Sequence, residues 1–218
     1  MASAFPGSPR VQKGGIVAYQ LPELIPTIVV FQYNPDEVTR QIEPNSAQWG
    51  GGRGDVDRLN GPPTETLSLS VEIDAADQLE FPRSNGVTVA HGLHPVLAAL
   101  EQLAYPPLPV MVANEMLALA GSAFIAAEKA PLALLVWGVR RVLPVQLTAL
   151  SIKEQSFDPA LNPIRATADL QLRVLTHRDV DPLNPGYWVY AASLAQKEVM
   201  AGINTFADAP GIRSMLPV

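Results

Sequence analysis

The sequence contains no cysteine and is poor in histidine, charge and aromatic rings. Among its 218 residues there are 3 histidines and no cysteine, which excludes disulfides, thiol nucleophiles and cysteine-ligated zinc or iron–sulfur sites. Charged residues make up 17% of the chain, against about 25% in an ordinary soluble domain. This shortage of solvating groups favours a protein whose surface is largely covered by other protein.

The net charge argues against a role with nucleic acid. It is formally -6, whereas binding to phosphates needs clustered Lys and Arg. Residues 1–11 contain two prolines and no continuous apolar segment, so we expect no secretory signal and assembly in the cytoplasm. The apolar run at residues 116–127 is shorter than the roughly 20 residues that span a bilayer, so we expect no membrane insertion.

No arrangement of residues in the sequence is typical of an active site. His91 and His94 lack a third metal ligand and the intervening Glu of the zincin motif. Residues 50–54 are rich in glycine but lack the Lys-Ser/Thr of a phosphate-binding loop, and no G-x-S-x-G elbow occurs. Glu72 and Asp74 lie on the polar side of a predicted strand. The sequence therefore predicts no catalytic residue, metal or cofactor, and a protein that is not an enzyme.

The hydrophobic pattern is that of a mainly antiparallel β-protein. Residues 66–74 and 166–174 alternate between apolar and polar side chains, as expected for strands with one buried face. Residues 145–149 alternate in one phase and residues 150–153 in the other, which predicts a β-bulge. Residues 15–20 and 38–42 are weaker strand candidates.

Two further segments, residues 27–33 and 132–137, are apolar at nearly every position. Both of their faces must therefore be covered. The domain core can cover one face, and the other needs a helix or a neighbouring subunit.

The 3.6-residue pattern predicts two helices. The first follows Pro95 and lies on the sheet, and the second runs from Pro185 to about residue 201, with Asn184 as N-cap and Gly202 at its end. Residues 115–129 form either a third helix or a variable insertion. The apolar stripes are Val96, Leu97, Leu100, Leu103 and Ala104 in the first helix, and Tyr187, Trp188, Ala191, Ala195 and Val199 in the second.

Two connecting segments stand out. Residues 45–63 form a long glycine-rich loop between two predicted strands, and loops of this length are usually functional or mobile. Residues 157–165 contain Asp158-Pro159 and Asn162-Pro163, which predict a rigid turn between two strands.

Five short motifs, in this order and spacing, carry a resemblance to a known family. They are residues 30–37 (VFQYNPDE), 61–67 (GPPTETL), 105–107 (YPP), 136–138 (VWG) and 150–166 (LSIKEQSFDPALNPIRA). On these motifs the chain resembles the tube-like baseplate proteins of contractile injection systems, which are phage-tail-like particles. The family includes tube-initiator proteins with or without a C-terminal LysM module.

The resemblance implies a fold and a set of partners. The fold is an antiparallel tail-tube-like β-barrel or sandwich with flanking helices, over residues 1–180, followed by a helix and tail over residues 181–218 in place of a LysM module. Six copies would join their sheets into a ring between the spike hub and the inner tube and nucleate tube assembly, in contact with other baseplate subunits. The alternatives are a monomeric β-sandwich binding module and a hydrolase with an unrecognised site.

The resemblance also assigns subunit contacts. The loop at residues 49–63 would reach a neighbouring subunit, the alternative being a mobile surface loop, and the turn at residues 157–165 would face the next layer. The interface residues expected on this basis are Trp49, Gly50, Gly51, Gly52, Arg53, Gly54, Asp55, Phe157, Asp158, Asn162 and Arg165.

Overall fold

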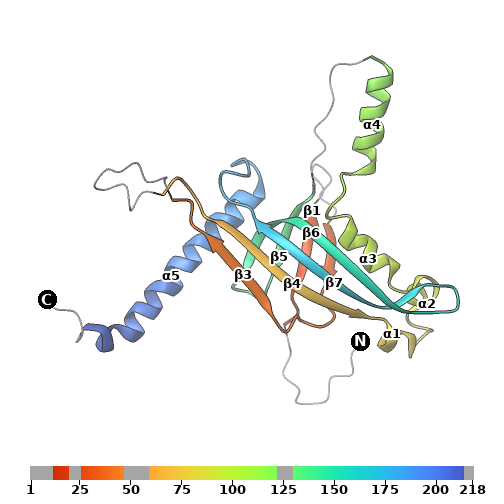
Figure 1. Cartoon of the computed structure of the whole chain (residues 1–218), viewed down its shortest axis with the longest axis horizontal. Coiled ribbons are helices and arrows are strands. Elements are labelled where there is room, and N and C mark those ends of the chain that lie inside the picture. The colour runs from red at the N-terminus through yellow and green to blue at the C-terminus, as the bar shows by residue number, and fades with distance from the viewer. Residues whose placement is uncertain (1–11, 20–25, 47–58, 122–129, 214–218) are drawn as a thin grey trace.

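The computed structural model describes residues 12–19, 26–46, 59–121 and 130–213, with side chains as far as residue 205. Seven strands in this part of the chain form one antiparallel sheet in the order β2-β1-β5-β6-β7-β4-β3 (Figure 1). The strands are β1 (Gly15–Tyr19), β2 (Pro26–Val30), β3 (Val38–Glu43), β4 (Thr64–Asp74), β5 (Leu132–Val136), β6 (Val142–Phe157) and β7 (Pro163–Val174). The sheet of a single chain is not closed, and β2 and β3 are its edges.

The neighbouring strands β4 and β7 follow the predicted alternation. Leu67, Leu69, Val71 and Ile73 of β4 are buried, while Ser68, Ser70 and Glu72 between them are exposed. In β7 the buried positions are Ala166, Ala168, Leu170, Leu172 and Val174. The two rows pair in register across the strands, for example Leu69 with Leu170. The prediction of two antiparallel strands with one buried face is confirmed.

The predicted bulge in β6 is also confirmed. The register against β7 shifts between Leu147 and Ala149, and the Thr148 hydroxyl there donates a hydrogen bond to the Gln171 carbonyl oxygen at 2.9 Å. β6 pairs with β5 over Val142–Val145 and with β7 from Val145 to Phe157, on both sides of the bulge. A bulge increases the local bend and twist of a strand. The sheet accordingly folds into two halves that share β6 (Figure 1).

Five helices accompany the sheet in the described residues: α1 (Ala76–Leu79), α2 (Gly86–His91), α3 (His94–Glu101), α4 (Leu108–Leu119) and α5 (Pro185–Arg213). The prediction that α3 lies on the sheet is confirmed, because Leu97, Leu100 and Leu103 are buried in the main hydrophobic core. None of the described helices is long and apolar enough to cross a bilayer.

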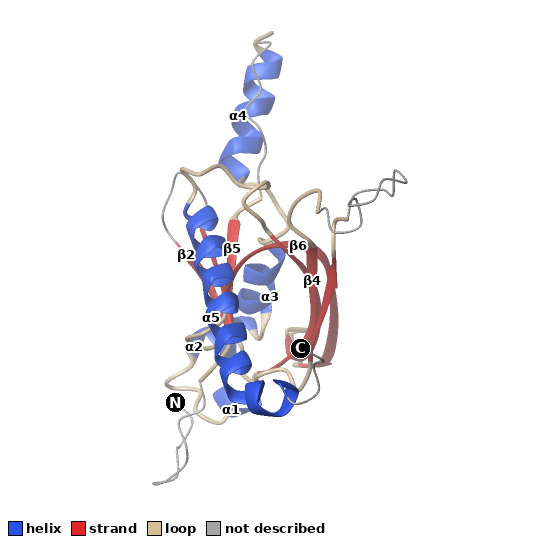
Figure 2. Ribbon diagram, turned by 90° about the vertical axis from the view of Figure 1, so that its left-hand side faces the viewer, coloured by secondary structure: helices blue, strands red, loops and turns tan. Residues whose placement is uncertain are grey.

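Helix α4 differs from the helix proposed at residues 115–129. It begins at Leu108 after Pro107 and ends at Leu119, and residues 122–129 lie outside the described part of the chain. Its side chains are exposed except at Val110 and Asn114. The helix stands away from the sheet in both views (Figures 1 and 2).

Helix α5 corrects one expectation. Its start is as predicted, because the Asn184 side chain accepts a hydrogen bond from the Gly186 backbone N–H at 2.9 Å. The predicted end at Gly202 is wrong, since the helix continues to Arg213. The apolar side named from the sequence is largely exposed: the side chains of Trp188 and Val199 are 65% and 57% exposed.

The side of α5 that contacts the body carries Gly186, Tyr190 and Lys197. Tyr190 reaches the core, and Lys197 binds Glu65 of β4. This tether turns the predicted apolar stripe away from the sheet. Figure 2 shows the helix lying in front of the sheet.

The two segments predicted to be apolar on both faces have different outcomes. In β5, Leu132 is buried and Leu134 and Val136 are partly buried, so both faces are covered. In edge strand β2, Val29 is buried but Ile28 and Val30 are 58% and 56% exposed. One face of β2 is therefore not covered by any described part of the chain.

Candidate subunit interface

The predicted interface residues belong to two segments of the chain. Trp49, Gly50, Gly51, Gly52, Arg53, Gly54 and Asp55 are outside the described residues, but both ends of their loop are described, next to β3 and β4. Phe157, Asp158, Asn162 and Arg165 lie at or near the β6–β7 turn. The described end of the loop and the turn lie at opposite ends of β4, because the strand runs from Thr64 to Asp74 beside Arg165, about 33 Å at roughly 3.3 Å per residue.

The base of the long loop is held by main-chain and arginine contacts. The Asn60 N–H donates to the Asn45 carbonyl oxygen at 2.7 Å, and Ser46 forms a β-bridge with Leu59. Arg178 Nη1 donates to the Asn60 carbonyl oxygen at 2.6 Å. The loop therefore leaves the β3–β4 hairpin from a fixed base.

Gly61 is required at this base. Its φ of +138° is a conformation that side-chain-bearing residues rarely adopt, and a Cβ there would collide with the Arg178 guanidinium. Without a side chain, the backbone can approach Arg178 closely. Sequence analysis missed Arg178, since 118 positions separate it from Asn60.

The turn between β6 and β7 is organised by the Asp158 carboxylate, as the sequence predicted for a rigid turn. Its Oδ1 accepts hydrogen bonds from the backbone N–H groups of Ala160 at 2.7 Å and Asn162 at 2.8 Å, and its Oδ2 accepts one from Asn162 Nδ2 at 2.8 Å. These bonds, led by the one from the Asn162 side chain, hold the pKa of Asp158 below its ordinary value. Phe157 and Leu161 are 50% and 76% exposed. The turn is a fixed support that presents two apolar side chains to the outside.

Arg165 is engaged within its own chain. Its Nε and Nη2 donate to Asp74 Oδ2 at 2.9 and 2.6 Å. Burial would raise the pKa of Asp74, but the backbone N–H of Ala76 and the Arg165 guanidinium outweigh it and lower the pKa. The pair joins β4 to β7 next to the turn, so the structure places Arg165 as a support of the turn.

A buried carboxylate that sequence analysis missed lies at the other end of β4. Glu65 is 4% exposed, its Oε2 accepts a hydrogen bond from Lys197 Nζ at 2.7 Å, and its Oε1 is 3.8 Å from Arg40 Nε. Oε1 has no hydrogen-bond partner among the described residues. Burial, followed by the charge of Glu65, raises the pKa of the neighbouring Tyr190. The cluster ties α5 to the β3–β4 edge of the sheet.

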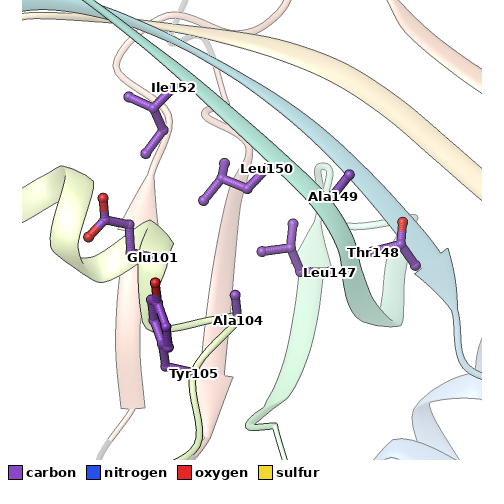
Figure 3. A pocket seen from close by; sticks show the side chains of 8 residues that line it. All are labelled: Glu101, Ala104, Tyr105, Leu147, Thr148, Ala149, Leu150 and Ile152. Atoms are coloured by element: carbon purple, nitrogen blue, oxygen red, sulfur yellow. The ribbon is translucent and has the colours of Figure 1, made fainter.

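The described part of the chain contains no arrangement typical of an active site. It holds no group of three or more His, Asp or Glu side chains that could bind a metal. A pocket of about 400 Å³ lies between α3 and β6, where Leu147, Leu150 and Ile152 point towards Glu101 and Tyr105 (Figure 3). Its lining lacks a nucleophile paired with a base.

No protein-family model matches the chain, and no curated protein matches its sequence.

Proposed function

We propose that this protein is a structural, non-enzymatic subunit of the baseplate of a contractile injection system. Six copies form a tube-initiator ring that adapts the spike hub to the inner tube and nucleates its assembly. In this proposal the ring is built in the cytoplasm as part of a phage-tail-like particle, binds hub, tube and other baseplate subunits, and needs no cofactor. The five sequence motifs indicate the family, and the open sheet supports the formation of a ring.

The observation that carries the proposal is the pair of free sheet edges. β2 and β3 end a curved, seven-stranded antiparallel sheet, and no strand among the described residues pairs with the outer side of either. Such edges are templates for pairing with another chain unless they are covered. Two different edges on one chain make a head-to-tail contact, which closes into a ring when the rotation per subunit allows it. Pairing β3 of one copy with β2 of the next would join the sheets into one barrel.

The polar face of the sheet is consistent with such a barrel. Ser68, Ser70 and Glu72 of β4 and Asp169 and Gln171 of β7 are exposed on the side opposite the core. On β4 and β7 this face needs no protein cover, so that part of it can border an aqueous lumen. In this arrangement the hub and the tube would contact the two rims of the ring, one of which includes the turn at Phe157 and Leu161.

Native mass spectrometry with negative-stain imaging tests the ring. The chain is measured alone and after mixing with its hub and tube proteins. We expect hexamers, or rings with a central hole that form once either partner is added. A chain that stays monomeric with both partners contradicts the proposal and favours the monomeric binding module.

A deletion tests the long loop separately. Removing residues 51–57 leaves the bonded base at Asn45 and Asn60 in place, so we expect an unchanged far-ultraviolet circular dichroism spectrum. If the loop clamps a neighbour, the same deletion abolishes particle assembly. Normal particles from this variant would show that the loop is dispensable.

A further inference from the structure

We propose that Arg173 and Arg178 form a binding site for a carboxylate that another protein supplies, at the end of the sheet opposite the Asp158 turn. The site lies where β7 ends and β4 begins, beside the base of the long loop. This inference rests on the proposed function, in which each rim of the ring contacts another protein. It names the chemistry of the contact at one of the two rims.

The two arginines line a small polar pocket. Its volume is about 150 Å³, and its lining also includes Asn45, Thr64 and Thr176. Pockets that hold a whole small molecule usually measure about 300–1,000 Å³. This pocket is therefore large enough for one anionic group, such as the carboxylate at the end of a side chain, and too small for an ordinary small-molecule ligand.

Arg178 is held in place and has no acidic partner among the described residues. Its Nη1 donates to the Asn60 carbonyl oxygen at 2.6 Å, and Gly61 lets the backbone approach the guanidinium closely. A guanidinium has five N–H donors. Within the described part of the chain, the bond to Asn60 is the only hydrogen bond of this guanidinium, and Arg178 forms no ion pair there. Most of its donors are therefore available to a ligand.

Arg173 is oriented by a carboxylate that is already fully used. Its Nη2 donates to Asp179 Oδ1 at 3.0 Å, and Asp179 Oδ2 accepts hydrogen bonds from the Thr176 backbone N–H and hydroxyl at 2.8 and 2.7 Å. Burial would raise the pKa of Asp179, but the bonds from Thr176 and the charge of Arg173 outweigh it and lower the pKa. Asp179 thus stays ionised, fixes Arg173 and neutralises one of the two positive charges.

The charge of the pocket favours an anion. Its lining contains two arginines and one carboxylate, so it carries a net positive charge in a chain whose formal net charge is -6. Arginine binds carboxylates and other oxyanions through paired N–H donors in a fixed geometry. Size and charge together indicate a single carboxylate or a similarly small oxyanion as the ligand.

The position of the pocket favours a carboxylate from a bound protein over a free anion. Arg173 follows the buried Leu172 in β7, so it lies on the polar face of the sheet. In the proposed ring the Asp158 turn lies at one rim, and the arginines lie at the other, where the hub or the tube protein would bind. A free anion would have to bind at a site open to water, since Arg178 and Asp179 are exposed. An acidic side chain of a bound protein would be held there by the rest of the interface.

Binding of the full chain to the hub protein and to the tube protein, measured separately by titration calorimetry, tests the site. Arg178→Gln removes a positive charge and should weaken binding to the protein that supplies the carboxylate about tenfold, because charge-assisted hydrogen bonds are lost. The loss should shrink as salt is added, since the pair is partly exposed. The control Arg83→Gln removes an exposed arginine between α1 and α2, at the other end of β4, and should leave that binding unchanged.

Two further measurements separate a direct contact from a change in the fold. Arg173→Gln leaves the bond between Arg178 and Asn60 in place and should weaken the same binding in the same direction. Arg178→Glu should weaken it further, and replacing the facing Asp or Glu of the partner with Arg should restore it. Thermal unfolding of each variant checks that the chain is folded before binding is measured. A loss that no charge reversal on the partner restores would contradict the direct contact.

The remaining outcomes are distinguishable. A wild-type chain that binds neither the hub nor the tube protein would reject the proposed function, and this inference with it. Equal binding of wild type and Arg178→Gln would reject the protein carboxylate and leave the proposed function intact. Inorganic phosphate would then identify what the pocket takes. A higher unfolding temperature of wild type but not of Arg178→Gln would assign the pocket to a free anion, and no change in either would reject the site altogether.

Discussion

The half of the sheet made of β4, β7 and the distal part of β6 differs from the half made of β2, β1 and β5 in what it turns away from the core. The first half exposes polar side chains such as Ser70 and Asp169. The second half exposes Ile28 and Val30 at its edge and has the partly buried Val17 and Leu134 beside them. The first half can face water as it is. The second half buries its exposed apolar side chains only when another protein surface covers them.

This difference suggests separate roles for the two halves: the first half stabilises the folded monomer, and the second offers a surface for assembly. Apolar side chains on the inner face of β4 and β7 are buried in the single chain, so their contribution to stability belongs to the monomer. Apolar side chains on the outer face of β2 add little to the stability of the single chain and can contribute only when a partner binds there. Substitutions that remove the same kind of side chain from the two halves should separate these contributions.

The largest expected effect is on the buried row. Leu172→Ala removes a side chain that is 1% exposed and should lower the free energy of unfolding by about 2–5 kcal/mol. Chemical denaturation of the monomer measures this loss. The matched variant Ile28→Ala removes an aliphatic side chain that is 58% exposed and should cost less than about 0.5 kcal/mol. Similar losses in the two variants would mean that Ile28 is covered within the monomer, and the contrast between the halves would fail.

The next largest effect concerns the spacing of β1 and β2 in the uncovered half. An added Cβ at Gly15 would lie 2.7 Å from the Val29 carbonyl oxygen, so the edge strand must move. Gly15→Ala should cost about 1–3 kcal/mol through overpacking, as measured by thermal or chemical unfolding. Gly86→Ala is the control, since nothing lies within 4 Å of its added Cβ. If both variants were equally stable, β2 would be free to shift and would make a poor template for pairing.

The third prediction tests the tether of α5. Lys197→Met leaves the buried Glu65 carboxylate without its close partner, and the expected cost is about 1 kcal/mol, reduced because Lys197 is 43% exposed on its side chain. The double variant Glu65→Met, Lys197→Met should recover that loss. Hydrogen exchange of residues 189–205 should be faster in the single variant than in wild type. Unchanged exchange would show that Tyr190 and the N-cap hold the helix without the ion pair.

The sequence was sufficient to predict the elements whose pattern is local. The alternation in residues 66–74 and 166–174 and the phase change in β6 each depend on neighbours along one strand, and the structure confirms all three. The Asp158 turn is local as well, since its partners lie within four positions.

Contacts between residues that lie far apart in the sequence could not be predicted. The sequence named an apolar side of α5 but not the direction it faces, which is set by the bond between Lys197 and Glu65, 132 positions away. Arg165 was expected at a subunit interface, and its bond to Asp74 across 91 positions was not foreseen. The pattern in residues 27–33 correctly indicated two apolar faces. Which of them would be uncovered depended on the strand order, in which β2 is an edge.

The smallest expected effect is the pH dependence of the β6–β7 turn, at the far end of the polar half. Hydrogen bonds from Asn162 and Ala160 lower the pKa of Asp158 from the ordinary value of 3.8. A carboxyl group whose pKa is lower in the folded state stabilises the fold above its unfolded pKa, and that contribution disappears as the pH falls through the folded pKa. The difference in the free energy of unfolding between wild type and Asp158→Ala should therefore have its full size near pH 6 and shrink below pH 3.8. Denaturation midpoints of wild type and variant across this range measure the difference.

Asp158→Asn, which keeps an acceptor oxygen but cannot ionise, separates the charge from the hydrogen-bonding geometry. A wild-type-to-alanine difference that stays constant with pH would mean that the charge of Asp158 does not hold the turn, and the turn would then be as dependent on a partner as the uncovered half of the sheet.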